Sequence, residues 1–132
     1  MDNFQLFDNK NTIRVVDKIT ITKNYLINFP SAFCTINELE NKKSVLIYYD
    51  KEAMKIGLEF MDELDSRGFK ITKAAGNNKG GYISAKSFFA VNGLMGRIRT
   101  GRYEYEAKEG TIGKNGSCVR TLYVINLESK NQ

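Results

Sequence analysis

The chain has 132 residues, of which 42% are hydrophobic and 11% aromatic, and its formal net charge is +5. This length and composition are those of one globular domain that can bury a core without disulfides, and its charges are too mixed in sign for a disordered chain. There is no histidine, which excludes the commonest general base, the triads built on it and the usual catalytic zinc sites. We therefore expect a single domain over residues 1–132, with flexible ends at 1–11 and 128–132, that is not an enzyme and holds no cofactor or metal.

The N-terminal sequence MDNFQLFDNK lacks a charged region followed by an apolar run, and no apolar run in the chain is long enough to span a membrane. Cys34 and Cys118 lie far apart, without the paired spacing of a zinc site or a redox motif. We expect a cytoplasmic protein with no membrane partner, in which both cysteines are reduced and structural.

In the first half of the chain, alternating apolar residues predict strands around one short helix. Residues 12–29 include the alternating sequence KITIT and are expected to form a strand or a hairpin with a turn at Asn24. The sequence PSAFCTINEL has apolar residues at helical spacing after Pro30, which predicts a short helix that Ser31 could cap. The sequence SVLIYYDKEAMKIGLEF, residues 44–60, is typical of an antiparallel hairpin with a polar turn.

The second half of the chain presents similar elements in a similar order. The sequence FKITKA alternates as a short strand, and YISAKSFFAVNGL predicts a strand followed by a helix that Ser84 could cap and Gly93 ends, with Val91 on its buried side. The sequences RIRTGRYEYEAKEG and CVRTLYVINL then predict a second antiparallel hairpin with a glycine-rich turn near residues 110–116.

A shift of 55 residues sets INFPSAFCTINEL against YISAKSFFAVNGL. It matches Phe33 with Phe88, Ile36 with Val91, Asn37 with Asn92, and Leu39 with Leu94. A duplicated strand-helix-hairpin unit would produce these matches, and so would helical core spacing alone. The predicted fold is α+β, a curved antiparallel β-sheet with two short helices, with or without this pseudo-duplication.

The positive charge is concentrated in one segment. Between Gly68 and Arg102 there is no Asp or Glu, whereas the rest of the chain holds all 15 acidic residues and 13 of the 20 basic ones. Such a concentration of positive charge is expected of a protein with a polyanionic partner, because neutralising the partner's phosphates releases condensed counterions, which favours binding. The alternative is a solvated face of a basic protein.

Tyrosines are interleaved with these cations, an arrangement that suits single strands, whose bases stack on rings while lysine and arginine follow the backbone. Arg97 and Arg99 would share one face of an extended segment. Tyr103 and Tyr105 would then either lie beside a guanidinium in the same groove or face the core. The predicted nucleic-acid-binding residues are Lys70, Lys73, Lys79, Tyr82, Lys86, Arg97, Arg99, Arg102, Tyr103 and Tyr105.

Two other motifs in the sequence argue against enzymatic sites. The glycines of AAGNNKGGY do not fit a Walker phosphate loop, because Gly76 and Gly80 are not followed by the required lysine and hydroxyl residue, and a hairpin turn is favoured. The carboxylates of Glu104 and Glu106 are two residues apart on an exposed strand face, which is typical of solvated side chains.

The element order, together with FKITK, GGYIS and RIRTGRYEY, resembles the single-stranded DNA-binding family that includes the positive cofactor four coactivators, their phage relatives and the plant Whirly proteins. This resemblance implies a curved sheet that binds single-stranded DNA, and potentially RNA, with little sequence preference, and a homodimer or higher homo-oligomer. The implied role is support of replication, recombination or transcription, in a phage for example.

A second, local resemblance concerns residues 21–60, ITKNYLINFPSAFCTINELENKKSVLIYYDKEAMKIGLEF. This segment is similar to the AbrB-type swapped-hairpin regulators, with Asn41, Lys42 and Lys43 where those proteins usually have a glycine before the hairpin. That similarity implies a dimeric, duplex-binding transcription regulator as the alternative function. A structural or interaction protein without nucleic-acid affinity is the third hypothesis.

Overall fold

The computed structural model describes residues 18–76, 79–112 and 118–128, without the side chains of 110–112, 118 and 119. Within these residues the fold is α+β, with two antiparallel five-stranded sheets and two short helices, which confirms the predicted class. The predicted flexible ends lie outside the described residues, apart from Glu128. The elements are β1 (Ile19–Ile21), β2 (Leu26–Phe29), α1 (Ser31–Ile36), β3 (Ser44–Asp50), β4 (Lys55–Met61), β5 (Phe69–Lys70), β6 (Thr72–Lys73), β7 (Gly81–Ser84), α2 (Lys86–Val91), β8 (Gly101–Tyr103), β9 (Glu106–Ile112) and β10 (Cys118–Asn126).

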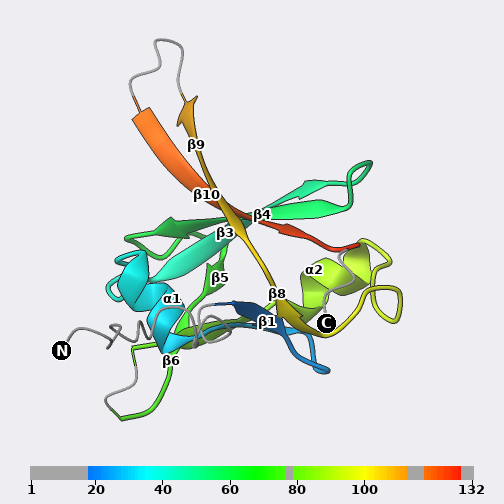
Figure 1. Cartoon of the computed structure of the whole chain (residues 1–132), viewed down its shortest axis with the longest axis horizontal. Coiled ribbons are helices and arrows are strands. Elements are labelled where there is room, and N and C mark those ends of the chain that lie inside the picture. The colour runs from blue at the N-terminus through cyan, green and yellow to red at the C-terminus, as the bar shows by residue number, and fades with distance from the viewer. Residues whose placement is uncertain (1–17, 77–78, 113–117, 129–132) are drawn as a thin grey trace, which may run out of the picture.

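The strands are divided between two sheets that share one core. Sheet A has the order β6-β7-β2-β1-β8, and sheet B has the order β5-β3-β4-β10-β9. Figure 1 shows sheet A in the lower part of the molecule and sheet B above it, with α1 on the left and α2 on the right. Within the described residues the chain passes from one sheet to the other three times, from β2 to β3 through α1, from β5 to β6 and from β8 to β9.

The predicted hairpins are present where the chain is described. Antiparallel pairing joins β1 with β2, β3 with β4, β6 with β7, and β9 with β10. The predicted first strand of the last hairpin, residues 97–110, is divided: residues 97–100 are not strand, β8 pairs with β1 in sheet A, and only β9 pairs with β10. Residues 12–17 of the first predicted hairpin and 113–117 of the last turn lie outside the described residues.

The ends of the two helices repeat each other at a separation of 55 residues. Each helix ends in a Schellman motif, in which two backbone N–H groups beyond the helix donate to carbonyls of its last turn. These bonds run from Glu38 to Thr35 and from Leu39 to Cys34 after α1, and from Gly93 to Ala90 and from Leu94 to Phe89 after α2. The side-chain amides of Asn37 and Asn92 also donate to equivalent carbonyls, those of Phe33 and Phe88. Three matched pairs of hydrogen bonds are more specific evidence of a duplicated unit than shared core spacing is.

The two strand-helix-hairpin units pack against each other through equivalent strands. In sheet A, β2 of the first unit pairs antiparallel with β7 of the second, with Ile27 opposite Ile83. In sheet B, β4 pairs antiparallel with β10. Antiparallel pairing of equivalent strands is the arrangement that an approximate two-fold axis produces, so the fold is pseudo-duplicated.

Two details of the predicted helices are wrong. Neither serine caps a helix, because the N-cap residues are Pro30 and Ala85 and no side chain caps either start. Ile36 and Val91 are 63% and 83% exposed, although their spacing predicted burial. Both helices end at these residues, so each side chain lies beyond the part of the helix that packs on the sheets.

The core between the sheets is rich in aromatic side chains. Phe33 is in edge-on contact with Tyr105 and Tyr123, with ring centroids 4.8 Å and 5.3 Å apart. Such pairs add to the free energy gained by burying the rings. Cys34 is buried and free, as predicted, while the side chain of Cys118 lies outside the described part of the chain.

Candidate nucleic-acid interface

The outer face of sheet A carries a row of polar side chains that crosses all five strands. In β1 and β2, Ile19, Ile21, Ile27 and Phe29 face the core, so the residues that alternate with them face outward. The strand register places one outward residue from each strand side by side. The row consists of Thr72, Tyr82, Asn28, Thr20 and Arg102.

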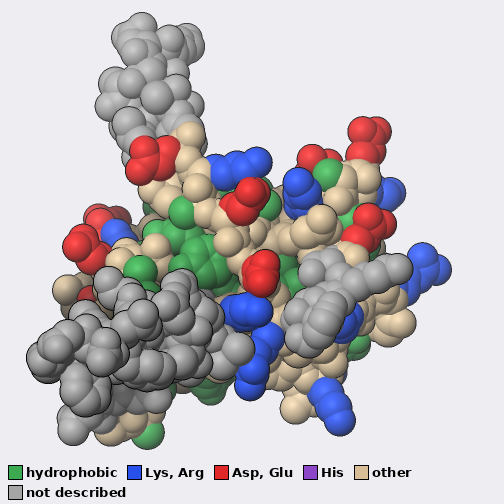
Figure 2. Space-filling view, in the orientation of Figure 1, with side chains coloured by type: hydrophobic (Ala, Val, Ile, Leu, Met, Phe, Trp, Pro, Cys, Tyr) green, Lys and Arg blue, Asp and Glu red, His purple; other side chains and the backbone are tan. Residues whose placement is uncertain are grey.

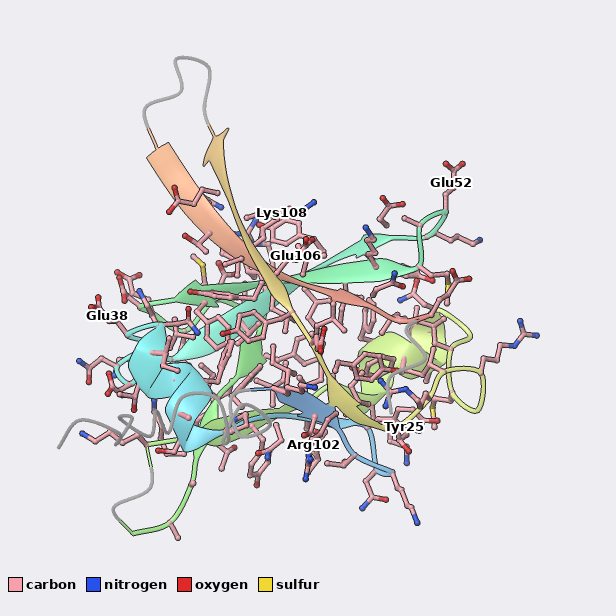
Figure 3. The ribbon with its side chains drawn as sticks, viewed as in Figure 1. Tyr25, Glu38, Glu52, Arg102, Glu106 and Lys108 are labelled. Carbon is pink, nitrogen blue, oxygen red and sulfur yellow. The ribbon has the colours of Figure 1, made fainter. Side chains whose placement is uncertain are left out.

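The side chains of this row are accessible and include no acid. Asn28, Thr72 and Arg102 are exposed, and Thr20 and Tyr82 are partly exposed. Figure 3 shows Arg102 at the lower side of the molecule, pointing away from β1, whereas Glu106, Lys108 and Glu52 lie above it, in the upper half of the view. The row therefore offers hydrogen-bonding groups, one guanidinium and one aromatic ring on a single surface.

Several basic side chains lie in the half of the molecule that contains this face (Figure 2). Figure 2 shows Lys and Arg side chains over the lower part of the molecule, and most of the visible Asp and Glu side chains higher up. At the margin, Lys18 and Glu104 form an ion pair of 3.3 Å, and the Glu104 side chain is largely exposed.

The predicted lysines lie on different parts of the surface. Lys70, Lys73, Lys79 and Lys86 are all exposed. Lys73 is on the edge strand β6 and its ammonium donates to the backbone carbonyl of Glu40. Lys86 is the first residue of α2, and Lys79 follows the turn after β6. Lys70 and Lys73 line the same concave surface.

The predicted pair Arg97 and Arg99 does not form one cationic face. Arg97 is exposed, whereas Arg99 is partly buried. The guanidinium carbon of Arg99 lies 4.1 Å from the centroid of the Tyr103 ring, and its Nη2 donates to the carbonyl of Arg102 at 2.8 Å. These contacts indicate that Arg99 stabilises the fold, so it is not included in the candidate interface.

Of the three predicted tyrosines, only Tyr82 lies on the outer face of sheet A. Tyr103 is 0% exposed, and its hydroxyl donates to the carbonyl of Arg99, so burial raises the pKa of Tyr103. Tyr105 packs on Phe33 and accepts a hydrogen bond of 3.2 Å from the amide of Asn37. For both residues the core-facing interpretation is the correct one, because they alternate with the exposed residues of β8 and the segment after it.

The glycines of AAGNNKGGY belong to a hairpin, as predicted, but they have two different roles. Gly76 has a φ of +69°, which a turn residue needs. Gly81 has an ordinary φ, and a Cβ atom there would lie 2.7 Å from the Thr72 carbonyl oxygen. Because Gly81 has no side chain, β6 and β7 can pair closely at this position.

A lysine-lined groove beside β6 contains residues that the sequence did not predict. It has a volume of about 520 Å³, and Lys42 and Lys43 from the loop before β3 line it together with Lys70 and Lys73. The remaining lining residues are Glu40, Asn41, Leu64 and Ile71. The pair Lys42-Lys43 was visible in the sequence, but only the pairing of β5 with β3 brings it to Lys70.

One further polar cluster lies on the outer face of sheet B. The Glu59 side chain accepts hydrogen bonds from the Tyr48 hydroxyl at 2.7 Å and from Arg120 Nη1 at 3.2 Å. The bond to Glu59 raises the pKa of Tyr48. Every polar group in this cluster has a protein partner, which is typical of a structural ion pair.

Within the described residues, no group of three acidic, cysteine or histidine side chains could hold a metal ion, and no helix is long and apolar enough to cross a membrane. The chain matches no protein-family model. Neither the curated proteins nor the solved structures with which it was compared match it. The proposed function therefore depends on the two surfaces described above.

Proposed function

We propose that this protein is a non-enzymatic nucleic-acid-binding protein that holds single-stranded DNA or RNA on the outer face of sheet A. The observation that carries the proposal is the cross-strand row of Thr72, Tyr82, Asn28, Thr20 and Arg102, which places a ring and a guanidinium among neutral hydrogen-bonding groups. Tyr82 would stack on a base, and Arg102 would contact phosphate. Asn28 and the threonines would bond to exposed base edges or sugars.

The ring on the outer face favours single strands over a duplex, because stacking requires bases that are not already paired and stacked. One ring offers one stacking site, which is consistent with low sequence specificity. Basic residues in the same half of the molecule supply the electrostatic part of binding, which does not depend on sequence.

A second candidate is a duplex-binding transcription regulator. The observation that favours it is the presence of two strand-helix-hairpin units in one chain. Equivalent strands of the two units pair antiparallel, β2 with β7 and β4 with β10. Duplex DNA has local two-fold symmetry, and proteins with a two-fold axis commonly match it. Such a protein would prefer one duplex sequence.

Fluorescence anisotropy with labelled oligonucleotides tests both candidates at 50 mM and 200 mM salt. The first candidate predicts tighter binding to a mixed-sequence single strand than to the same sequence as a duplex, weakening as salt rises. A preference for duplex would overturn it, and strong preference for one duplex among many would support the second. Absence of binding to every probe at 50 mM salt would leave a structural or interaction role.

The variant pair Tyr82→Ala and Arg102→Ala tests the location of binding. Both side chains point out of sheet A. Each variant should bind about tenfold or more weakly, because Tyr82→Ala removes one stacking contact and Arg102→Ala removes one charged contact. Lys51→Ala removes a charge from the exposed β3–β4 turn and serves as the control. Equal losses in all three variants would show that binding depends on net charge and not on the outer face of sheet A.

Light scattering with and without oligonucleotide measures the molar mass in solution and so tests the predicted homodimer.

A further inference from the structure

The lysine-lined groove lies at the edge of sheet A, next to the end of the polar row. Thr72 is the last member of the row on β6, and the next residue, Lys73, lines the groove. On the other side, the groove is closed by the loop before β3, which provides Lys42 and Lys43. Backbone hydrogen bonds fix these walls together, from Ile71 N–H to the Lys43 carbonyl and from Lys43 N–H to the Met61 carbonyl.

The four lysines of the groove are not equivalent. Lys42 forms an ion pair of 2.8 Å with Asp62, which largely offsets its charge. The Lys73 ammonium donates to the Glu40 carbonyl, a neutral group, so its charge is retained. Lys43 and Lys70 are exposed and form no ion pair with any residue that the structure describes.

One acidic residue, Glu40, also lines the groove. With Lys42 paired to Asp62, three lysine charges face this one carboxylate, and the groove has a net positive charge. Like charges gathered on one concave surface destabilise each other, and a bound anion relieves this repulsion. The volume of about 520 Å³ lies within the roughly 300–1,000 Å³ of ordinary ligand sites.

We propose that this groove is a phosphate-binding site, in which Lys43 and Lys70 bind the phosphate groups. Lys73 holds the side of the groove that contains Glu40 in place, through its hydrogen bond to the Glu40 carbonyl. The identity of the ligand rests on the proposed function: phosphates of a strand that leaves the row over the edge strand β6 would enter the groove. The exposed Leu64 and buried Ile71 give the groove an apolar side, which suits a sugar or base attached to the bound phosphate.

The groove itself is tested with inorganic tripolyphosphate, a probe that needs no nucleic-acid affinity. Titration of ¹⁵N-labelled protein should give saturable amide shifts at residues 41–43 and 70–73. The Lys43→Ala/Lys70→Ala double variant should lose at least tenfold in affinity, and Glu40→Gln, which removes the opposing carboxylate, should gain affinity. The control Lys51→Ala/Lys108→Ala changes the net charge equally on the far side and should bind like the wild type. Shifts scattered over all lysines, or equal losses in both double variants, would overturn the proposal.

Oligonucleotide binding by the same variants identifies the source of the phosphate. If the groove takes nucleic-acid phosphates, the oligonucleotide displaces tripolyphosphate, and the slope of log affinity against log salt falls by about 1.4 for two lost contacts to a single strand. If the oligonucleotide binds but neither displaces tripolyphosphate nor responds to Lys43→Ala/Lys70→Ala, the strand does not enter the groove and the assignment to nucleic acid is overturned. If no oligonucleotide binds while tripolyphosphate does, the proposed function fails and the groove is a site for free phosphate compounds.

Discussion

Glu38 and Gly93 occupy the same left-handed backbone position, one residue past the C-caps of α1 and α2. Their φ angles are +58° and +68°, and the N–H group of the residue that follows each one donates to a carbonyl three residues before the C-cap. The backbone of the first unit therefore adopts a conformation that favours glycine, but it does so with a glutamate.

Replacing Glu38 with Gly should stabilise the protein by about 1 kcal/mol, because a side chain in the left-handed region costs roughly 1–2 kcal/mol. The Glu38 side chain is exposed, so little contact is lost. Gly93→Ala is the matched opposite: a Cβ there meets no atom within 4 Å, and its cost of about 1 kcal/mol is conformational. Urea denaturation measures both. A destabilised Glu38→Gly variant would contradict the equivalence of the two positions.

Arg99 should contribute to folding stability in the absence of any nucleic acid. Arg99→Ala removes the contact with the Tyr103 ring and the hydrogen bond to the Arg102 carbonyl, and we expect a loss of about 1–2 kcal/mol. The exposed Arg97 is the control, and Arg97→Ala should change stability by less than about 0.5 kcal/mol. Thermal unfolding of the two variants compares them directly. Equal effects would mean that the Arg99–Tyr103 contact adds nothing to the fold.

Arg120 should be needed to keep Glu59 buried. The Glu59 residue is 5% exposed and its carboxylate lies 3.2 Å from Arg120 Nε. Because Arg120→Ala leaves a buried charge with only the Tyr48 hydroxyl as a partner, we expect a loss of about 2–3 kcal/mol, somewhat below the range for fully buried pairs. The double variant Glu59→Gln/Arg120→Ala removes the stranded charge and should recover part of this loss in urea denaturation. A double variant less stable than Arg120→Ala would contradict the explanation.

Stability should fall between about pH 9 and pH 11, partly because of Cys34. Burial raises the pKa of the Cys34 thiol from 9.0 to about 11, so the unfolded chain loses this proton at a lower pH than the folded protein does. The contribution is fully present below pH 9 and is lost as the pH rises through the folded pKa of about 11. Denaturation at several alkaline pH values should therefore show a shallower loss for Cys34→Ala than for the wild type. Parallel curves would exclude a role for this thiol.

The sequence by itself predicted most of the local structure. Period-two alternation located the hairpins, helical spacing located α1 and α2, and the match of Asn37 with Asn92 indicated the duplication. These features depend on interactions within a few residues, or on which face of a single element is apolar. The charge segregation between Gly68 and Arg102 was equally evident, because charge can be counted without knowing the fold.

Only the tertiary structure decided which side chains share a surface. Strand pairing put Thr20, Asn28 and Tyr82 in one row and brought Lys43 to Lys70, although these residues are distant in the chain. It also buried Tyr103, whose alternation with Arg102 fits a buried or an exposed ring equally well until the core side is known. The strand register is selected by the free energy of burying the apolar faces of both sheets together. This free energy depends on segments that are distant in the chain, so it cannot be predicted from any one of them.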